Sequence, residues 1–293
     1  MTRSPLDRAP AWSLAVVAML SVQLGTAVSV GLFPVIGVAG TAWLRLTFGA
    51  IGFVVIARPR YQRWTWRELR APAVLGLVSG LMTLCFLQAV ARLPLGTTVA
   101  IEFLGPLTVA TVHSRSRGAL LWPLLALAGV LALTEPWTGS VDGIGVLFAA
   151  SSAVGWGAYI VITQHVGDRF AGVDGLAISL PVAAVLVAFA GLPQAWGHIT
   201  PGVVGVGLVA AVLLPIIPWT FELYALRRLT AAAFGTLMAL EPAIAAVIGV
   251  LLLHDAPGPL QAVGIACVVV AGIGAERRGH RPGEPALPEP LGG

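Results

Sequence analysis

The sequence of 293 residues is poor in charge. Only 10% of its residues are Asp, Glu, Lys or Arg, whereas a soluble globular protein carries about 25%. Hydrophobic residues make up 57%, and the mean hydropathy is +0.91. Such a chain has too little polar surface to remain in water, which excludes a soluble globular domain. The composition therefore indicates an integral membrane protein.

All 17 basic residues are arginine, so the sequence contains no lysine. A Walker-type phosphate-binding loop needs the pattern GxxxxGK[ST], so ATP-driven transport by the chain itself is disfavoured. The net charge of +4 does not indicate nucleic-acid binding, because no soluble part remains to present a basic face. An excess of arginine in cytoplasmic loops explains its sign.

Cysteine and histidine are also scarce, with two and five residues. Cys85 and Cys267 lie in apolar runs without a CxxC pattern, and the histidines form no HExxH pattern. No Ser/His pair or paired Asp appears within the apolar runs. We therefore predict no metal, no cofactor and no enzymatic activity.

Continuous apolar runs fill most of the chain, and the alternation typical of a membrane β-barrel is missing. Because a helix needs about 20 apolar residues to cross a bilayer, we predict an all-α integral membrane protein. Its ten transmembrane helices are expected at about 11–31, 35–57, 72–90, 93–112, 119–134, 143–164, 173–191, 202–224, 229–252 and 259–275.

The arginines predict the orientation of these helices. With the N-terminus in the cytoplasm, 15 of the 17 arginines fall in inner segments, and the outer loops hold only Arg92. Arg45 lies within a helix. Residues 1–10 are then a cytoplasmic N-terminus, and residues 276–293, rich in Pro, Gly and Glu, are a disordered cytoplasmic tail.

Two of the apolar runs combine a glutamate with a proline near their centres. Residues 93–113 contain Glu102 and Pro106, and residues 229–253 contain Glu241 and Pro242. A charged side chain at the centre of a membrane helix costs roughly 3 kcal/mol. A chain that carries two such groups at similar places is expected to use them.

An internal repeat relates the two halves of the chain. A shift of 136 residues places Pro106 on Pro242, and it gives identical partners to Leu87, Ala89, Arg92 and Leu93. In this alignment Glu102 and Glu241 are three positions apart, so they are not strict repeat partners. Because each half has five predicted helices, the second half enters the membrane from the opposite side. This predicts an inverted repeat around a central site, with halves at 11–134 and 143–275 and an external linker at 135–142.

The motifs of the chain resemble those of a known family. They include Ile101-Glu102-Phe103-Leu104-Gly105-Pro106-Leu107, Trp156-Gly157-Ala158-Tyr159-Ile160 and Met238-Ala239-Leu240-Glu241-Pro242-Ala243. These stretches are similar to the EamA repeats of the drug/metabolite transporter superfamily, and more closely to its bacterial threonine/homoserine exporter branch. The resemblance implies ten helices, both termini in the cytoplasm and secondary export across the bacterial cytoplasmic membrane. It does not identify a substrate.

Each candidate site residue has a functional and a structural interpretation. Glu102 can exchange a proton in a central cavity, or it can be a neutral acid that bonds a neighbouring helix. Glu241, beside Pro242, can belong to the site or stabilise a helix kink. Arg45 can pair with a substrate carboxylate or with Glu102, or its side chain can extend to the outer surface.

Other candidates are uncharged. Gln23 can line the cavity or join two helices, and Trp156 and Tyr159 can wall the cavity or pack in the core. Pro106, Pro215, Pro218 and Pro242 are candidates for helix kinks or gating. Glu222 is expected to be structural and to pair with Arg227 or Arg228.

These observations favour a secondary exporter of small metabolites that exchanges protons for amino acids such as threonine or homoserine. One alternative is a carrier of another metabolite, a drug, a nucleotide sugar or a lipid-linked substrate with the same architecture. A non-transporting membrane subunit is the alternative from a different class. The expected partners are a small molecule, protons and the lipid bilayer. The sequence leaves the oligomeric state open.

Overall fold

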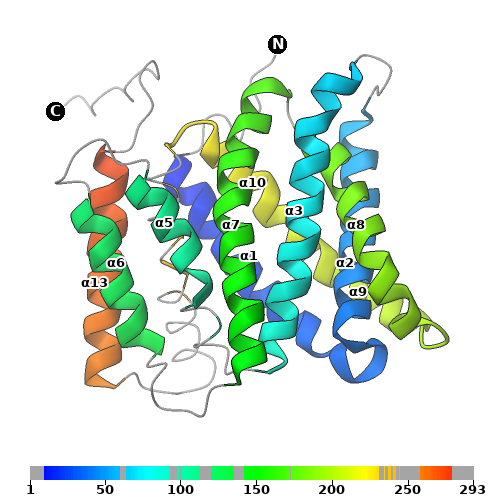
Figure 1. Cartoon of the computed structure of the whole chain (residues 1–293), viewed down its shortest axis with the longest axis horizontal. Helices are drawn as coiled ribbons and strands as arrows, with labels where there is room; N and C mark the ends of the chain where they lie inside the picture. Colours follow the sequence, from blue (N-terminus) through cyan, green and yellow to red (C-terminus); the bar gives the residue numbers. More distant parts are fainter. Residues whose placement is uncertain are drawn as a thin grey trace, which may run out of the picture.

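The computed structural model describes residues 10–59, 64–92, 98, 101–112, 120–134, 142–171, 173–230, 234, 237–238, 240–241, 244 and 258–278. Every regular element in these ranges is a helix (Figure 1). The helices are α1 (Ala11–Val30), α2 (Phe33–Ala57), α3 (Trp66–Val90), α5 (Leu104–Val112), α6 (Leu121–Thr134), α7 (Gly143–Arg169), α8 (Asp174–Ala195), α9 (Pro201–Ala211), the π-helix η4 (Val212–Ile216), α10 (Ile217–Leu226) and α13 (Pro259–Arg278).

Six of these segments are long and apolar enough to cross a membrane: α1, α2, α3, α7, α8 and the continuous stretch Pro201–Leu226. The predicted all-helical membrane fold is thereby confirmed. The predicted count of ten membrane helices stays a prediction, because most of the segment 229–252 lies outside the described residues.

Some helices are longer than their apolar runs predicted. α3 begins at Trp66 instead of residue 72, because Thr65 and Glu68 form a capping box at its start. α7 continues to Arg169 instead of ending near residue 164. Hydropathy marks only the part of a helix that matches the hydrocarbon layer, whereas capping groups and polar turns extend the helix beyond it.

α2 is interrupted near its start. Gly37 has φ 72° and ψ 170°, a conformation that strongly favours glycine. The break leaves the N–H groups of Ala39 and Gly40 outside the regular helical pattern. Both donate to the side-chain oxygen of Gln194 in α8, at 2.9 and 3.3 Å. One side chain of α8 therefore satisfies the broken turn of α2.

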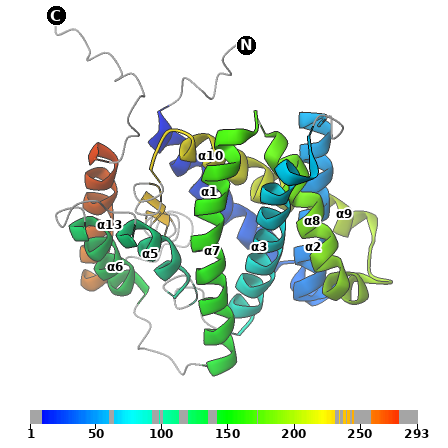
Figure 2. The same ribbon diagram turned by 45° about the horizontal axis from the view of Figure 1, so that its top comes forward.

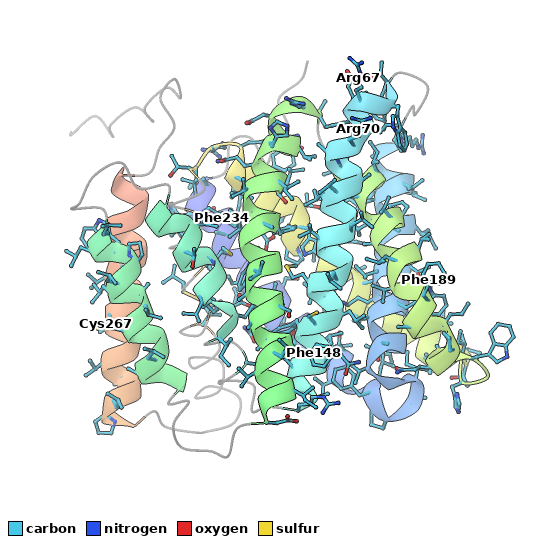
Figure 3. The ribbon with its side chains drawn as sticks, viewed as in Figure 1. Arg67, Arg70, Phe148, Phe189, Phe234 and Cys267 are labelled. Atoms are coloured by element: carbon cyan, nitrogen blue, oxygen red, sulfur yellow. The ribbon has the colours of Figure 1, made fainter. Side chains whose placement is uncertain are left out.

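The helices pack side by side in an extended bundle (Figures 1 and 2). α2 packs on α8, α3 on α7, and α6 on α13, while α1 packs on α10. The start of α1 and the end of α13 lie toward the same end of the bundle. Arg67 and Arg70, at the start of α3, also lie at this end, and Phe189 points outward from α8 (Figure 3).

The contact between α2 and α8 requires glycine at position 191. A Cβ atom at Gly191 would overlap the carbonyl oxygen of Ala39 and the Cβ atom of Trp43. We expect Gly191→Ala to lower the free energy of unfolding by about 1–3 kcal/mol, because a backbone oxygen cannot move away cheaply. Thermal unfolding of purified protein in detergent measures this as a lower Tm.

Gly205 in α9 is the matched control, since a Cβ atom there would meet nothing within 4 Å. Gly205→Ala should leave the Tm unchanged or raise it, because alanine favours the helix by up to about 1 kcal/mol. Equal effects of the two substitutions would contradict the assigned packing.

Candidate functional site

A cavity whose lining includes several polar and ionisable side chains lies inside the bundle. α1, α2, α3, α7, η4 and α10 line it together with the segments around Glu102 and Glu241. The space that the centres of water-sized molecules can occupy is about 90 Å³. The lining residues are Val22, Gln23, Thr26, Arg45, Leu46, Met82, Thr83, Phe86, Glu102, Phe103, Trp156, Tyr159, Leu214, Pro215, Trp219, Glu222 and Glu241.

Glu102 lies two residues before α5 and is buried. The hydroxyl group of Ser152, which is fully buried in α7, donates to its Oε1 at 2.5 Å. The Ser152 Oγ also lies 3.3 Å from the carbonyl oxygen of Met82 in α3. Because a hydroxyl has one hydrogen and two lone pairs, Ser152 can serve Glu102 in either protonation state. It donates to the ionised carboxylate, or it accepts from the neutral acid and donates to Met82.

Glu241 is equally buried and lines the same cavity. The side-chain nitrogen of Gln23 in α1 donates to its Oε1 at 3.0 Å. Gln23 therefore both lines the cavity and connects two parts of the bundle. The alignment of the prolines placed Glu102 and Glu241 three positions apart in the repeat, yet both residues line one cavity.

Glu222 corrects a sequence-based expectation. The hydroxyl group of Tyr159 in α7 donates to its Oε2 at 2.8 Å, and Glu222 lines the cavity. Arg227, its expected partner, instead donates to the carbonyl oxygens of Gly167 and Phe170, at 2.8 and 2.6 Å. The arginines close in sequence suggested a surface ion pair, but α10 turns Glu222 inward.

Arg45 is 4% exposed, which excludes extension of its side chain to the outer surface. Its Nη1 donates to the hydroxyl oxygen of Ser29 in α1 at 3.2 Å. Among the described residues, its Nε has no hydrogen-bond partner, and no carboxylate lies within 4.0 Å of its guanidinium. Of the alternatives considered for Arg45, the direct pair with Glu102 is therefore not formed in this structure.

Aromatic side chains form part of the cavity wall. The rings of Trp156 and Phe103 meet edge to face with centroids 5.1 Å apart, and those of Tyr159 and Trp219 lie 5.6 Å apart. Ser152, Trp156 and Tyr159 follow the i, i+4, i+7 spacing of one helix face. α7 therefore contributes both an apolar wall and two hydrogen-bond donors.

The candidate prolines occupy different positions. Pro215 in η4 lines the cavity, whereas Pro218 is buried in α10 outside the lining. Pro106 is buried in α5, beside Gly105, at which a Cβ atom would overlap the carbonyl oxygen of Ala153. Pro242 lies outside the described residues. No group of three His, Cys, Asp or Glu side chains suited to a metal ion occurs in the described part of the chain.

Several helices of membrane-spanning length around an internal cavity with buried ionisable side chains define a multi-pass membrane protein. Comparison with known sequences identifies its family. The model of the EamA-like transporter family matches residues 143–274. The threonine/homoserine exporter RhtA of Escherichia coli (strain K12) is 33% identical over 278 residues, which cover 92% of this chain and 93% of the relative.

The protein of the same name from Salmonella typhimurium (strain LT2) is 33% identical over 264 residues, covering 88% of each chain. The chain thus belongs to the EamA-like transporter family, and it is a transporter rather than an enzyme. One solved crystal structure has a TM-score of 0.69 at 20% identity, covering 91% of this chain and 98% of that one. This likeness shows the fold.

The bond between Tyr159 and Glu222 is testable by a double-mutant cycle. Tyr159→Phe removes the donor, and Glu222→Leu leaves the buried hydroxyl without its acceptor. Each should lower the free energy of unfolding by about 1–3 kcal/mol. The double variant should be more stable, by about 0.5–3 kcal/mol, than the sum of the two single-variant effects predicts. Unfolding in mixed detergent micelles measures these values.

Tyr224→Phe is the matched control, because its ring faces the Arg227 guanidinium at 5.1 Å and phenylalanine retains that ring. Combined with Glu222→Leu, it should be additive within about 0.5 kcal/mol. Additivity in the Tyr159 cycle would show that the bond contributes nothing.

Proposed function

We propose that the protein is a secondary active exporter of small amino acids, such as threonine or homoserine, and that it exchanges them for protons by alternating access. The named relatives are threonine/homoserine exporters, aligned over nearly the whole chain. The observation that carries the proposal is the buried carboxyl of Glu102, held by Ser152 in a cavity of the membrane-spanning bundle.

Proton exchange requires a carboxyl group that is stable in two protonation states. Ser152 can satisfy both states of Glu102, because its hydroxyl lies near the carboxyl oxygen and near the Met82 carbonyl. A proton or a cationic group of the substrate can then neutralise the same carboxyl in turn. That competition couples the outward movement of substrate to the inward movement of protons.

Alternating access fits two inverted five-helix repeats, 11–134 and 143–275. If the two repeats exchange places, α1 corresponds to α7, α2 to α8, and α3 to the stretch α9–α10. The contact of α3 with α7 then corresponds to that of α1 with α10. The contact of α3 with α8 corresponds to that of α2 with α9. All four contacts occur.

The hydrogen bonds of Glu102 and Glu241 show the same correspondence between the repeats. Glu102 in the first repeat bonds Ser152 in α7, and Glu241 in the second repeat bonds Gln23 in α1. This reciprocal packing supports a site between two related halves, each of which can rock against the other.

The dimensions and charge of the cavity favour a small substrate. Among the described residues that line it, Arg45 is the one basic side chain, and the centres of water-sized molecules can occupy about 90 Å³ of it. A nucleotide sugar or a lipid-linked phosphate needs several basic groups for its phosphates. An amino acid with a short polar side chain fits both limits.

We also propose that the protein lies in the bacterial cytoplasmic membrane with both termini in the cytoplasm. Arg67 and Arg70 lie at the end of the bundle where α1 begins and α13 ends (Figure 3), as the positive-inside rule expects.

Reconstituted transport tests the proton site. Proteoliposomes loaded with labelled threonine or homoserine should release it faster when a pH gradient drives protons in the opposite direction. Glu102→Gln should reduce this release to the rate seen without a gradient, because the amide cannot ionise. Glu68→Gln is the control, since glutamine also completes a capping box and Glu68 lies at the exposed start of α3.

Gradient-driven release that persists in correctly inserted Glu102→Gln would exclude this residue as the proton site. Absence of amino-acid release in the wild type would instead remove the substrate assignment and direct the search to other metabolites.

Cysteine labelling tests the orientation. In a background with Cys85 and Cys267 replaced by serine, Arg67→Cys should react with a membrane-impermeant maleimide only after the cells are permeabilised. His198→Cys, between α8 and α9, should react in intact cells. Both positions are exposed. The reverse pattern would invert the proposed topology.

A further inference from the structure

The lining of the cavity includes one basic side chain and three carboxyl groups, and no described carboxyl group forms an ion pair with that basic side chain. Glu102, Glu222 and Glu241 provide three buried carboxyl groups from three different segments of the chain. Arg45 provides the basic group, and no carboxylate of the described residues lies within 4.0 Å of it. The lining therefore offers a small ligand both hydrogen-bond donors and hydrogen-bond acceptors.

The guanidinium of Arg45 has unused donors. A guanidinium carries five N–H bonds, and one hydrogen bond connects this group to the described residues, from Nη1 to Ser29. Ser29 itself donates to the carbonyl oxygen of Gly25 at 2.6 Å, so its lone pair faces the arginine. The buried Nε has no partner among the described residues.

Arg227 shows the hydrogen bonding of an arginine that connects helices in this chain. Its Nε and Nη2 donate to two backbone carbonyls at the end of α7. Arg45 has no such arrangement with the described residues and lines the cavity instead. Its planar, charged fork matches a carboxylate, which accepts two parallel hydrogen bonds from it.

The three carboxyl groups of the lining each retain acceptor capacity. Within the described part of the chain, Glu102, Glu222 and Glu241 each receive one side-chain hydrogen bond, from Ser152, Tyr159 and Gln23, whereas a carboxylate has about four lone-pair positions. An ammonium group carries three donors and fits this surrounding. Trp156 and Trp219 also line the cavity, and an aromatic ring whose face meets a cation adds attraction for it.

We propose that Arg45, held by Ser29, binds the carboxylate of the substrate, and that the three glutamates receive its ammonium group, so that the cavity selects zwitterionic α-amino acids over amines and over hydroxy acids. This assignment rests on the proposed export function and gives that site its chemical selectivity.

Analogue competition in counterflow tests the assignment. Proteoliposomes take up labelled threonine in exchange for internal threonine, and three unlabelled competitors are added outside. These are threonine, threoninol, which has a hydroxymethyl group in place of the carboxylate, and 3-hydroxybutyrate, which lacks the ammonium group. In the wild type, threonine should compete at least about 30-fold better than either analogue. Threoninol leaves Arg45 without a carboxylate partner, and 3-hydroxybutyrate leaves the glutamates without an ammonium partner.

Arg45→Gln should remove the preference for threonine over threoninol while threoninol competes as well as before. Arg45→Lys, which keeps the charge and loses the fork, should give an intermediate preference. Arg92→Gln is the matched control, because this exposed arginine pairs with Asp142 away from the cavity, and its preference should equal that of the wild type.

Two results would overturn the assignment. One is threoninol competing as well as threonine in the wild type, a measurement that needs no variant. The other is an equal loss of threonine and threoninol binding in Arg45→Gln, which a purely structural arginine would cause.

If the wild type transports no threonine, the export proposal fails first. The rise in Tm of the detergent-solubilised protein with each of the three compounds then decides the assignment alone. Stabilisation by threonine exceeding that by both analogues supports it, and equal or absent stabilisation overturns it.

Discussion

The cost of placing polar and ionisable groups inside a membrane-spanning bundle determines the organisation of this protein. Each of the three glutamates in the cavity receives a hydrogen bond from a neutral group on another segment, and Arg45 donates one to such a group. Ser152 serves Glu102, Tyr159 serves Glu222, and Gln23 serves Glu241, while Ser29 accepts from Arg45. Neutral partners lower the desolvation cost without cancelling the charge. The cavity therefore retains groups that can still respond to a proton or a ligand, which paired opposite charges could not do as readily.

Glycines and other small residues give these bonds their geometry. Gly105 approaches Ala153 in α7, and Gly76 approaches the backbone of Ser179 in α8. Close backbone approach fixes the spacing between helices, so side chains as short as serine can reach across the interface. α7 contacts α3, α5 and α10 and presents Ser152, Trp156 and Tyr159 along one face. A central helix of this kind can transmit a change at one carboxyl group to several neighbours.

The sequence predicted the helical membrane class, and it singled out Glu102, Arg45, Glu241, Gln23, Trp156 and Tyr159, which line one cavity. Polar groups are visible in a sequence when they interrupt a long apolar run. Glu222 was misinterpreted because it lies near the end of its run, where adjacent arginines offer an obvious surface partner. Ser152 was overlooked, because serine is common in membrane helices and only the fold shows that it faces Glu102. Helix starts such as that of α3 depend on capping bonds beyond the hydrocarbon layer, which hydropathy does not detect.

The broken turn of α2 has a consequence for how such a chain can diverge. Gly37 lacks a side chain at the place where the carboxamide of Gln194 enters, and that carboxamide accepts from Ala39 and Gly40. Neither residue is useful without the other: a larger residue at 37 displaces the carboxamide, and a shorter side chain at 194 leaves two amides unbonded. Separate replacement of either passes through a less fit intermediate, so the two positions should change together among descendants of a common ancestor. A single insertion in α8 between Ala184 and Gln194 would rotate the carboxamide by about 100° around the helix and should be rare for the same reason.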